Sequence, residues 1–282
     1  MSRALILGKG FVGTKLKKYF DDLEYRSTLI GKTDLDYTKP HNLIDFIIQN
    51  KISTVVNCSG YTGTPNVDAC ESNKEICWLY NVVIPNIITK VCKDLGVPCM
   101  HVSSGCIYTG YEKRFIETDI PNFGLYYKES SFYSKTKHAF ETIADLDYAA
   151  ILRIRMPFTD TLEPKNYLYK ILKYDNLISF DNSLTSIDDL NNFIFKLVQN
   201  FKPGIYNVVN TEPTNAKNIV EIFKQHNVAN TNWSFVDMDK LNIIAGRSNC
   251  VLATAKIAHM GAELSDTHAT VDKCIYNISK LL

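Results

Sequence analysis

Short runs of apolar residues alternate, through the first half of the chain, with longer stretches in which apolar residues recur every three or four positions. Short runs of this kind predict buried strands, and the longer pattern predicts helices that cover them. Regular alternation of the two predicts βαβ units, and therefore a doubly wound parallel sheet of the α/β class. The expected strands are Ala4–Leu7, Tyr25–Ile30, Thr54–Cys58, Cys99–Ser103, Ala149–Ile154 and Leu177–Phe180.

One long helix is expected over Asn73–Leu95, because apolar residues keep helical spacing through it, and Pro85 should kink it. After Met156 the pattern loosens. It predicts helices at Asn166–Tyr174, Ile187–Gln199 and near Ile219 and Ile275, and a strand at Gly204–Asn207. We therefore expect a core domain over residues 1–155 and a smaller lobe over residues 156–282, with some strands and helices of the second part returning to the core sheet.

Composition narrows the functional classes by exclusion. A chain of 282 residues with 45% hydrophobic and 22% charged residues is typical of a folded globular protein. Lys+Arg 31 against Asp+Glu 30 gives a formal net charge of +1, which provides no broad basic surface for nucleic acid or anionic lipid. The apolar stretch Ala4–Gly8 is too short for a secretory signal or a membrane span. We expect a cytoplasmic protein with a small-molecule partner, without nucleic-acid or membrane partners.

The eight cysteines are scattered along the chain and form no Cys-x-x-Cys pair. This spacing argues against a zinc site or a disulfide framework, so we expect no metal. Most of the cysteines are expected to be small buried apolar residues.

A glycine-rich turn, Gly8-Lys9-Gly10-Phe11-Val12-Gly13, follows the first expected strand and opens a helix. In this context the first glycine permits a tight turn, the second lets the backbone approach a pyrophosphate, and the third lets helix and strand pack closely. The turn therefore predicts a dinucleotide cofactor bound by a Rossmann domain over residues 1–155. Lys32, rather than an acid that would bind the ribose of NAD, follows the second strand, which favours NADPH.

Tyr133 and Lys137 have the i, i+4 spacing that puts two side chains on one helix face. A lysine ammonium beside a phenol lowers the pKa of that tyrosine, and such a pair serves acid/base chemistry in carbonyl reduction. The same spacing recurs at Tyr169/Lys173 and Tyr276/Lys280. Only Tyr133 follows the fourth strand, where it can reach a cofactor at the carboxyl edge of the sheet, so the other two pairs are expected on helix surfaces.

Ser104 and Cys106 lie where the strand that begins near Cys99 ends, which is the edge at which α/β sheets bind ligands. If extended geometry continues that far, the two side chains face the same way. From the residues alone, Cys106 could be either a cysteine packed in the core or one that lines the cleft. His101 and His138 are expected to pack or to form hydrogen bonds rather than to catalyse.

In their order along the chain, the glycine turn, Ser104, and Tyr133 with Lys137 resemble the extended short-chain dehydrogenase/reductase family. A closer similarity is to the nucleotide-sugar 3,5-epimerase/4-reductases of that family, and it covers residues 4 to about 256. Its blocks are Asn57–Ser72, which contains Thr62-Gly63-Thr64-Pro65-Asn66-Val67-Asp68, and then Ser104–Ile107, Ser131–Lys137, Leu152–Pro157 and Gly246–Asn249.

This resemblance implies a bifunctional enzyme, a homodimer, that converts UDP-4-keto-6-deoxy-D-glucose to UDP-L-rhamnose with NADPH. It implies an NADP-binding Rossmann domain and a mainly substrate-binding lobe. The implied catalytic residues are Ser104, Cys106, Tyr133, Lys137 and Lys170, with Cys106 and Lys170 serving epimerisation. The implied cofactor contacts are Gly8, Gly10, Phe11, Val12, Gly13, Lys32, Cys58, Ser59, Gly60, Asn81, Tyr133, Lys137, Met156 and Pro157. The implied contacts to the UDP-sugar are Thr62, Asn66, Asn166, Arg247 and Asn249.

Two alternatives remain. One is a reductase without epimerase activity, similar to dTDP-4-dehydrorhamnose reductases; the presence of Cys106 and Lys170 argues against it. The other is a regulatory subunit that keeps the fold but has lost turnover. The intact set of Ser104, Tyr133 and Lys137 argues against that reading.

Overall fold

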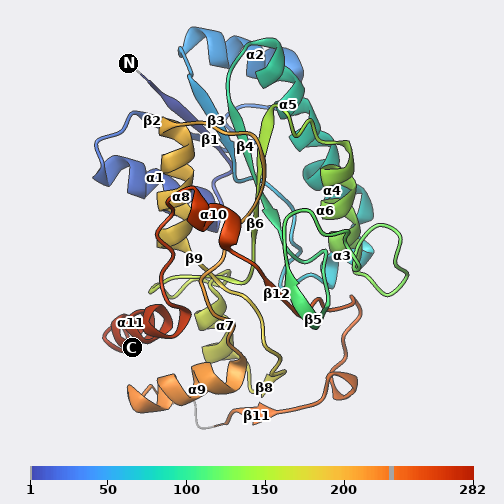
Figure 1. The fold of residues 1–282 in the computed structure, drawn as a ribbon, viewed down its shortest axis with the longest axis vertical. Coiled ribbons are helices and arrows are strands. Elements are labelled where there is room, and N and C mark those ends of the chain that lie inside the picture. Colours follow the sequence, from blue (N-terminus) through green and yellow to red (C-terminus); the bar gives the residue numbers. More distant parts are fainter. Residues whose placement is uncertain (1, 229–231) are drawn as a thin grey trace.

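A parallel sheet forms the centre of the computed structural model, which describes residues 2–228 and 232–282. Within those residues it has six strands in the order β10-β6-β4-β3-β1-β2 (Figure 1). The strands are β1 (Ala4–Leu7), β2 (Ser27–Ile30), β3 (Thr54–Asn57), β4 (Cys99–Ser104), β6 (Ala149–Ile154) and β10 (Gly204–Asn207). The predicted doubly wound parallel sheet is confirmed.

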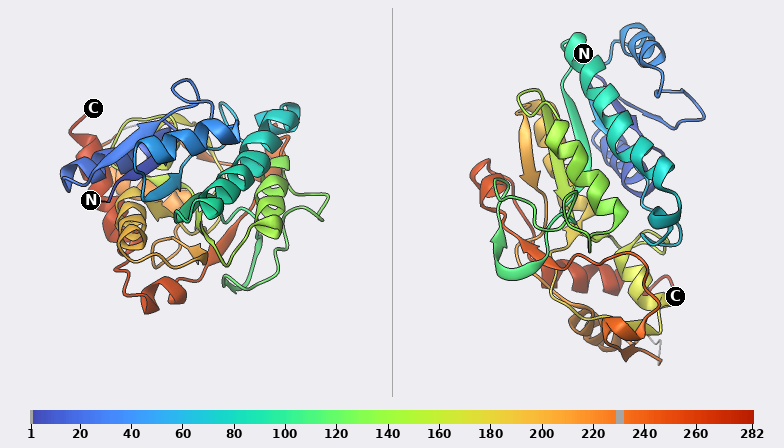
Figure 2. Two further views of the ribbon diagram at one scale, coloured as in Figure 1. Left: turned by 90° about the horizontal axis from the view of Figure 1, so that it is seen from above. Right: turned by 90° about the vertical axis from the view of Figure 1, so that its right-hand side faces the viewer.

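Helices cover both faces of this sheet, because each has one apolar side to bury. Figures 1 and 2 show α1 (Phe11–Asp22) and α8 (Ile187–Gln199) on one face, and α2 (Pro40–Gln49), α5 (Ile84–Asp94) and α6 (Phe132–Ile143) on the other. Leu16 and Phe20 of α1 share a core with Leu190 and Ile194 of α8. The second core forms between α2, α5 and the opposite face of the sheet.

The long helix expected over Asn73–Leu95 is a continuous helical run with an irregular centre. It consists of α4 (Lys74–Trp78), a π-helical segment at Leu79–Val83, and α5; the four-residue α3 (Ala69–Ser72) precedes it. Pro85 lies in the first turn of α5, where a missing N–H is tolerated. The interruption is therefore the π-helical segment that immediately precedes Pro85.

The smaller lobe has its own apolar core below the sheet (Figure 1). It contains β7 (Pro157–Phe158) paired with β9 (Thr185–Ser186), α7 (Tyr167–Lys173), β8 (Asn176–Leu177) paired with β11 (Ser234–Phe235), α9 (Ala216–Gln225) and α11 (Thr267–Ser279). The expected sheet strand Leu177–Phe180 is wrong. Of β8 only Leu177 is buried, and the following Phe180 is exposed, so this segment cannot form a central strand.

Part of the second half of the chain returns to the central sheet. The edge strand β10 pairs with β6, and α10 (Ala255–His259) packs on β10. The loop strands β5 (Gly110–Phe115) and β12 (Cys250–Leu252) pair near the carboxyl edge of the sheet, and a short 3-10 helix covers Met238–Lys240. Within the described residues, no helix has the length and apolar character needed to span a membrane.

Candidate active site

The glycine-rich turn joins β1 to α1 and has the geometry of a phosphate cradle. Gly8 has φ +105°, and a Cβ there would lie 2.7 Å from the backbone nitrogen of Ser59. A Cβ at Gly13 would lie 2.0 Å from the carbonyl oxygen of Gly8, so helix and strand pack too closely for a side chain. A Cβ added at Gly10, by contrast, would meet no atom of a neighbouring segment within 4 Å, and no side chain caps α1. A dinucleotide pyrophosphate fits this open helix N-terminus, whose first turn contains Phe11 and Val12.

The end of β2 carries both a lysine and an acid. Lys32 is exposed, and its hydrogen bond with Tyr80 raises the pKa of the ammonium. Asp34, an acid not expected from the sequence, lies four residues beyond β2. It accepts a hydrogen bond from the backbone N–H of Gly31 at 2.7 Å and pairs with Nζ of Lys9 at 2.7 Å. The hydrogen bond from Lys9 lowers the pKa of Asp34. The carboxylate is therefore charged and already paired with a lysine of the glycine turn.

The loop after β3 contains Cys58, Ser59 and Gly60 and lies against the glycine turn. The side-chain oxygen of Asn57 accepts a hydrogen bond from the backbone N–H of Ser59 at 3.0 Å, which fixes the start of the loop. Burial raises the pKa of Cys58 to about 12, so its thiol is neutral.

Asn81 lies in the π-helical segment and is fully buried. Its Oδ1 accepts from the N–H of Tyr61 at 2.9 Å, and its Nδ2 donates to the carbonyl oxygen of Tyr61 at 2.8 Å. A Cβ at Gly60 would lie 3.2 Å from Oδ1 of Asn81 and 3.5 Å from Nζ of Lys137. Asn81 thus holds the loop after β3 beside Lys137.

Two side chains fix the start of α6. Oγ of Ser131 accepts a hydrogen bond from the N–H of Ser134 at 3.0 Å, which is an N-cap. Oε1 of Glu71 accepts from the N–H of Phe132 at 2.6 Å and adds negative charge at the helix N-terminus. These contacts fix the first turn, which contains Tyr133.

The predicted pairing of Tyr133 with Lys137 is confirmed in geometry, since Nζ of Lys137 lies 5.6 Å from the centre of the Tyr133 ring. Burial raises the pKa of Tyr133, and the nearby Cys106 adds to this, although a hydrogen bond with Ser104 opposes it. Desolvation is the largest influence, so the pKa of Tyr133 is raised rather than lowered as expected. Burial also lowers the pKa of Lys137 to about 8. At neutral pH the phenol is protonated, as a proton donor must be.

Cys106 lies in the turn that follows β4, because the strand ends at Ser104. Strand alternation therefore does not relate the two side chains. The backbone N–H of Cys106 instead donates to Oγ of Ser104 at 3.2 Å, and this keeps both residues at the same edge. Cys106 is half-buried, and its Sγ accepts a hydrogen bond from Nη1 of Arg155 at 3.4 Å. Arg155 directly follows β6, whose last two residues are Arg153 and Ile154. A second arginine immediately beyond a buried strand was the signal that could have identified it.

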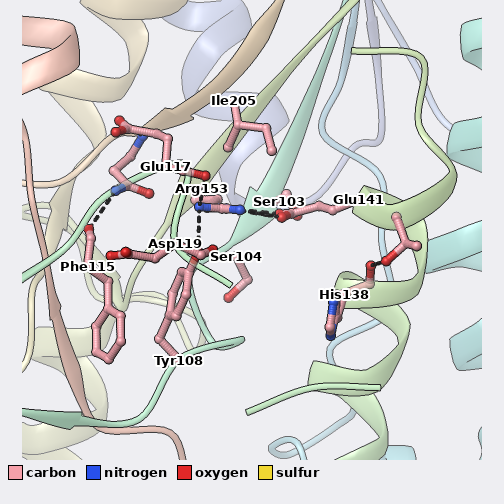
Figure 3. A network of polar contacts seen from close by, with 12 residues as sticks. Ser103, Ser104, Tyr108, Phe115, Glu117, Asp119, His138, Glu141, Arg153 and Ile205 are labelled. Carbon is pink, nitrogen blue, oxygen red and sulfur yellow. Dashed lines mark hydrogen bonds and ion pairs between the residues drawn. The ribbon is translucent and has the colours of Figure 1, made fainter. Parts of the chain in front are cut away.

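A second buried arginine, Arg153, ties α6 to β6 behind Ser104 (Figure 3). Its Nη2 donates to Oε2 of Glu141 at 2.7 Å, and its Nη1 donates to the hydroxyl of Tyr108 at 3.1 Å. Glu141 lies four residues after Lys137 on α6. The ion pair therefore fixes the position of the helix that carries Tyr133 and Lys137.

The chain turns sharply after β6 at Met156, which has φ +39°, and Pro157 begins β7. Both predicted cofactor contacts therefore lie directly at the carboxyl end of β6. They stay predictions, as do the other expected contacts of the cofactor.

On α7, Lys170 is half-buried, and within the described part of the chain no hydrogen bond from its Nζ is found. Burial lowers the pKa of Lys170, and the charge of Lys165 lowers it further. Asn166, expected to bind substrate, is fully buried and caps α7 instead. Its Nδ2 donates to the carbonyl oxygens of Thr159 and Thr161, so no donor is left for a ligand. Its role is to position the helix of Lys170.

Other predicted substrate residues lie in two loops that contact each other. Thr62 accepts a hydrogen bond from Nζ of Lys165 at 3.1 Å, and Asn66 accepts one from the N–H of Asp68 at 2.8 Å. Nη1 and Nη2 of Arg247 donate to the two carboxylate oxygens of Asp68 at 2.9 and 3.1 Å. Burial by itself would raise the pKa of Asp68, but the contact with Arg247 lowers it, and the pKa is below its usual value. Arg247 is thus paired before any diphosphate binds.

The remaining predicted substrate contact, Asn249, is half-buried and accepts a hydrogen bond from Nδ2 of Asn182 at 3.0 Å. Its backbone carbonyl accepts a hydrogen bond from the N–H of Gly110 at 2.9 Å. These two contacts fix the loop that follows Arg247.

The structure also shows where the other lysine pairs, the histidines and the cysteines lie. Lys173 and Lys280, the lysines of the other two Tyr-x-x-x-Lys pairs, are exposed. His101 bonds Asn57 and Thr89, and His138 accepts from the N–H of Leu125 at 3.0 Å. Five cysteines are buried, namely Cys70, Cys77, Cys92, Cys99 and Cys250.

Comparison with known proteins shows that residues 2–279 match the RmlD substrate binding domain. The chain is 30% identical, over 98% of its length, to a trifunctional UDP-glucose 4,6-dehydratase/UDP-4-keto-6-deoxy-D-glucose 3,5-epimerase/UDP-4-keto-L-rhamnose-reductase of Arabidopsis thaliana, of which it spans only 42%. It is also 30% identical to a bifunctional dTDP-4-dehydrorhamnose 3,5-epimerase/dTDP-4-dehydrorhamnose reductase of the same plant, covering 82% of this chain and 78% of that protein.

Solved structures show the same fold. The UDP-rhamnose synthase of Acanthamoeba polyphaga mimivirus has a TM-score of 0.89 at 23% identity, with 98% of this chain and 99% of that chain covered. The dTDP-4-dehydrorhamnose reductase of Bacillus anthracis, solved in complex with NADP, has a TM-score of 0.84 at 17% identity over 100% of both chains. The similar proteins are thus epimerase/reductases and reductases of nucleotide sugars, built on a Rossmann fold.

Proposed function

Because the chain belongs to the RmlD substrate-binding domain family, we propose that it is a bifunctional 3,5-epimerase/4-keto-reductase that converts UDP-4-keto-6-deoxy-D-glucose to UDP-L-rhamnose with NADPH. The observation that supports this best is the place of Cys106. Its thiol lies half-buried at the same sheet edge as Ser104 and Tyr133, and it accepts a hydrogen bond from a buried arginine. A reductase that only transfers hydride has no use for such a thiol.

The reductive half consists of Ser104, Tyr133 and Lys137. The bound NADPH would supply the hydride that reduces the C4 ketone. Tyr133, protonated because burial raises its pKa, donates its proton to the oxygen on C4 as negative charge develops there. Ser104 donates a hydrogen bond to the same oxygen, and the cationic Lys137 stabilises the phenolate left on Tyr133.

The epimerising half consists of Cys106 and Lys170. The C4 ketone acidifies the C–H bonds at C3 and C5, so a base on one face of the ring can remove a proton and leave an enolate. The thiolate of Cys106 takes this proton and becomes a thiol. The ammonium of Lys170 returns a proton to the same carbon from the opposite face, which inverts the centre. Burial lowers the pKa of Lys170 and so makes its ammonium a better acid.

NADPH is proposed over NADH because Lys32 is exposed after β2, while Asp34 is already paired with Lys9. Two lysines there favour a 2′-phosphate, and a paired carboxylate repels it less. For the UDP end of the substrate, Arg247 offers the forked donors that suit a diphosphate. Thr62, Asn66 and Asn249 are proposed as further substrate contacts.

A homodimer in the cytoplasm is part of the proposal. Ile76, Trp78 and Val83 are exposed along α4 and the π-helical segment, and Ile143 is exposed on α6, a helix that packs against both segments. Apolar side chains gathered on neighbouring helices favour contact with a second copy.

Light scattering should give twice the chain mass for the wild type, and Trp78→Glu should shift the measured mass toward that of the monomer. A monomeric wild type would contradict the proposed homodimer.

The activity itself is tested by incubating the protein with UDP-4-keto-6-deoxy-D-glucose and NADPH and identifying the sugar by NMR. UDP-L-rhamnose is the expected product. A sugar reduced at C4 but unchanged at C3 and C5 would favour the reductase-only alternative. No consumption of NADPH with either this ketone or its dTDP counterpart would favour the regulatory subunit.

A further inference from the structure

Two arginines at the end of β6, Arg153 and Arg155, are buried to 2% and 1% exposure, yet only one has a counter-ion. Arg153 pairs with Glu141 at 2.7 Å. For Arg155, no carboxylate lies within ion-pair distance in the described part of the chain. Its guanidinium donates to the hydroxyl and carbonyl oxygens of Ser248 and to the side-chain oxygen of Asn182, and its Nε has no partner there. A buried cation with only neutral partners is unfavourable, so an anion should accompany it.

The acidic groups that act most strongly on Arg155 are Cys250, Cys106, Tyr167 and Tyr111. Three of them are neutral. Burial raises the pKa of Cys250, raises that of Tyr111, and raises that of Tyr167 to about 12. Cys106 is the one of the four whose side chain accepts a hydrogen bond from the guanidinium, at 3.4 Å.

The backbone fixes this contact. The N–H of Gly105 donates to the carbonyl oxygen of Ile154 at 3.0 Å, which holds the turn after β4 against the end of β6. A Cβ at Gly105 would lie 2.5 Å from Leu252 and 3.2 Å from the aliphatic part of Arg155. A side chain at position 105 would therefore have to displace Leu252 and Arg155, and glycine lets the turn lie close to the guanidinium.

We propose that Arg155 is the positioning residue of the epimerising half: its buried guanidinium is the counter-charge that keeps the sulfur of Cys106 a thiolate and aims it at the sugar. The inference rests on the proposed function for its purpose, but the charge relation can be measured without any substrate. The reacting proton passes from carbon to sulfur, and Arg155 itself neither gains nor loses a proton.

Several groups face Cys106 and bear on the pH at which its thiolate forms. Tyr133 and Lys137 of α6 interact with it, as does Cys250 of β12. Lys137 is the second cation, so it adds to the effect of Arg155 but forms no hydrogen bond with the sulfur in the structure.

The test measures the rate at which iodoacetamide alkylates Cys106 at several pH values between 6 and 9. Mass spectrometry of the peptide that contains Cys106 monitors the reaction. Only the thiolate reacts. We expect Arg155→Gln to slow alkylation at pH 7 by about tenfold or more, with recovery as the pH rises, and Arg155→Lys to restore most of the wild-type rate. Cys58 and Cys274, whose pKa burial raises to about 12, serve as internal references that should stay slow.

The matched control is Arg153→Lys, which alters an equally buried arginine that has no contact with Cys106. It should leave the alkylation profile unchanged. An unchanged profile in a folded Arg155→Gln protein, shown by its NADPH binding and near-ultraviolet circular dichroism, would overturn the inference.

A measurement on the wild type covers the case in which no Arg155 variant folds. The ultraviolet absorbance of a thiolate is compared between the wild type and Cys106→Ser at pH 7. Excess absorbance in the wild type is expected, and its absence would overturn the inference. If the thiolate depends on Arg155 while the C3 and C5 protons never exchange, the inference holds and the proposed epimerase function fails. If these protons exchange but the alkylation rate of Cys106 does not depend on Arg155, the epimerase function holds and the inference fails.

Discussion

The two halves of the site are held in place by different means. Ser104 and Tyr133 belong to the core domain, at the end of β4 and in the first turn of a capped helix, and an internal ion pair behind them fixes that helix. Cys106 lies in a turn outside the strand, and Lys170 comes from a helix of the smaller lobe. The reductive half is therefore built on rigid elements of one domain. The epimerising half needs both parts of the chain to be correctly placed, so it can be lost while reduction survives.

The largest expected effect comes from removing the proton donor of the reductive half. Tyr133→Phe should lower the rate of C4 reduction by about two to four orders of magnitude, because the ring still packs but the acid is gone. NADPH binding should change little, and exchange at C3 and C5 should persist. Stopped-flow loss of NADPH absorbance measures the rate. Tyr276→Phe, which alters an exposed pair of the same spacing, is the control; normal turnover by Tyr133→Phe would show that another group is the acid.

A smaller effect is expected at the cofactor. Lys32→Asp should reduce the preference for NADPH over NADH by about tenfold or more, since an acid repels a 2′-phosphate and binds a ribose hydroxyl. Fluorescence titration of both cofactors measures the ratio. Lys51→Asp, an exposed lysine at the other end of the sheet, should leave the ratio unchanged. Equal affinities of the wild type for the two cofactors would refute the assignment of Lys32.

The smallest expected effect is on stability. Burial lowers the pKa of Lys137 from 10.5 to about 8, so between these pH values the unfolded chain keeps a proton that the folded chain has lost. The wild type's free energy of unfolding should therefore rise with pH through that window. Lys137→Met should stabilise the fold by roughly 1 to 3 kcal/mol at pH 7, and its advantage should shrink toward pH 10.5. Urea unfolding at several pH values tests this, with the less buried Lys135→Met as the control.

Much of the central sheet could be predicted from the sequence, because most of its strands are buried and consist mainly of apolar residues. Ala4–Leu7 and Ala149–Ile154 match the observed strands end to end. The lobe was harder, since strands such as β8 have two residues and leave no periodic pattern. Gly204–Asn207 was recognised as a strand, but only tertiary structure shows that it pairs with β6.

The site divides in the same way. Residues that follow a motif, such as the glycine turn and Tyr133 with Lys137, could be found from spacing. Partners that long-range packing brings together could not: Asp68 lies 179 residues from Arg247, and Arg155 lies 49 residues from Cys106. For Asn166 the sequence led to too much rather than too little: it was expected to bind substrate, but its side chain caps α7.

The measurement that tests the separation of the two halves most directly is proton exchange in deuterated water. With UDP-4-keto-6-deoxy-D-glucose, NMR should show the wild type and Tyr133→Phe exchanging the protons at C3 and C5. Cys106→Ala should suppress this exchange, and Lys170→Ala should allow at most partial exchange without inversion. The Cys106→Ala and Lys170→Ala variants should still reduce a ketone already in the rhamno configuration. If Cys106→Ala forms UDP-L-rhamnose from the gluco-configured ketone at the wild-type rate, the thiol is a packing residue and the epimerising half does not exist as described.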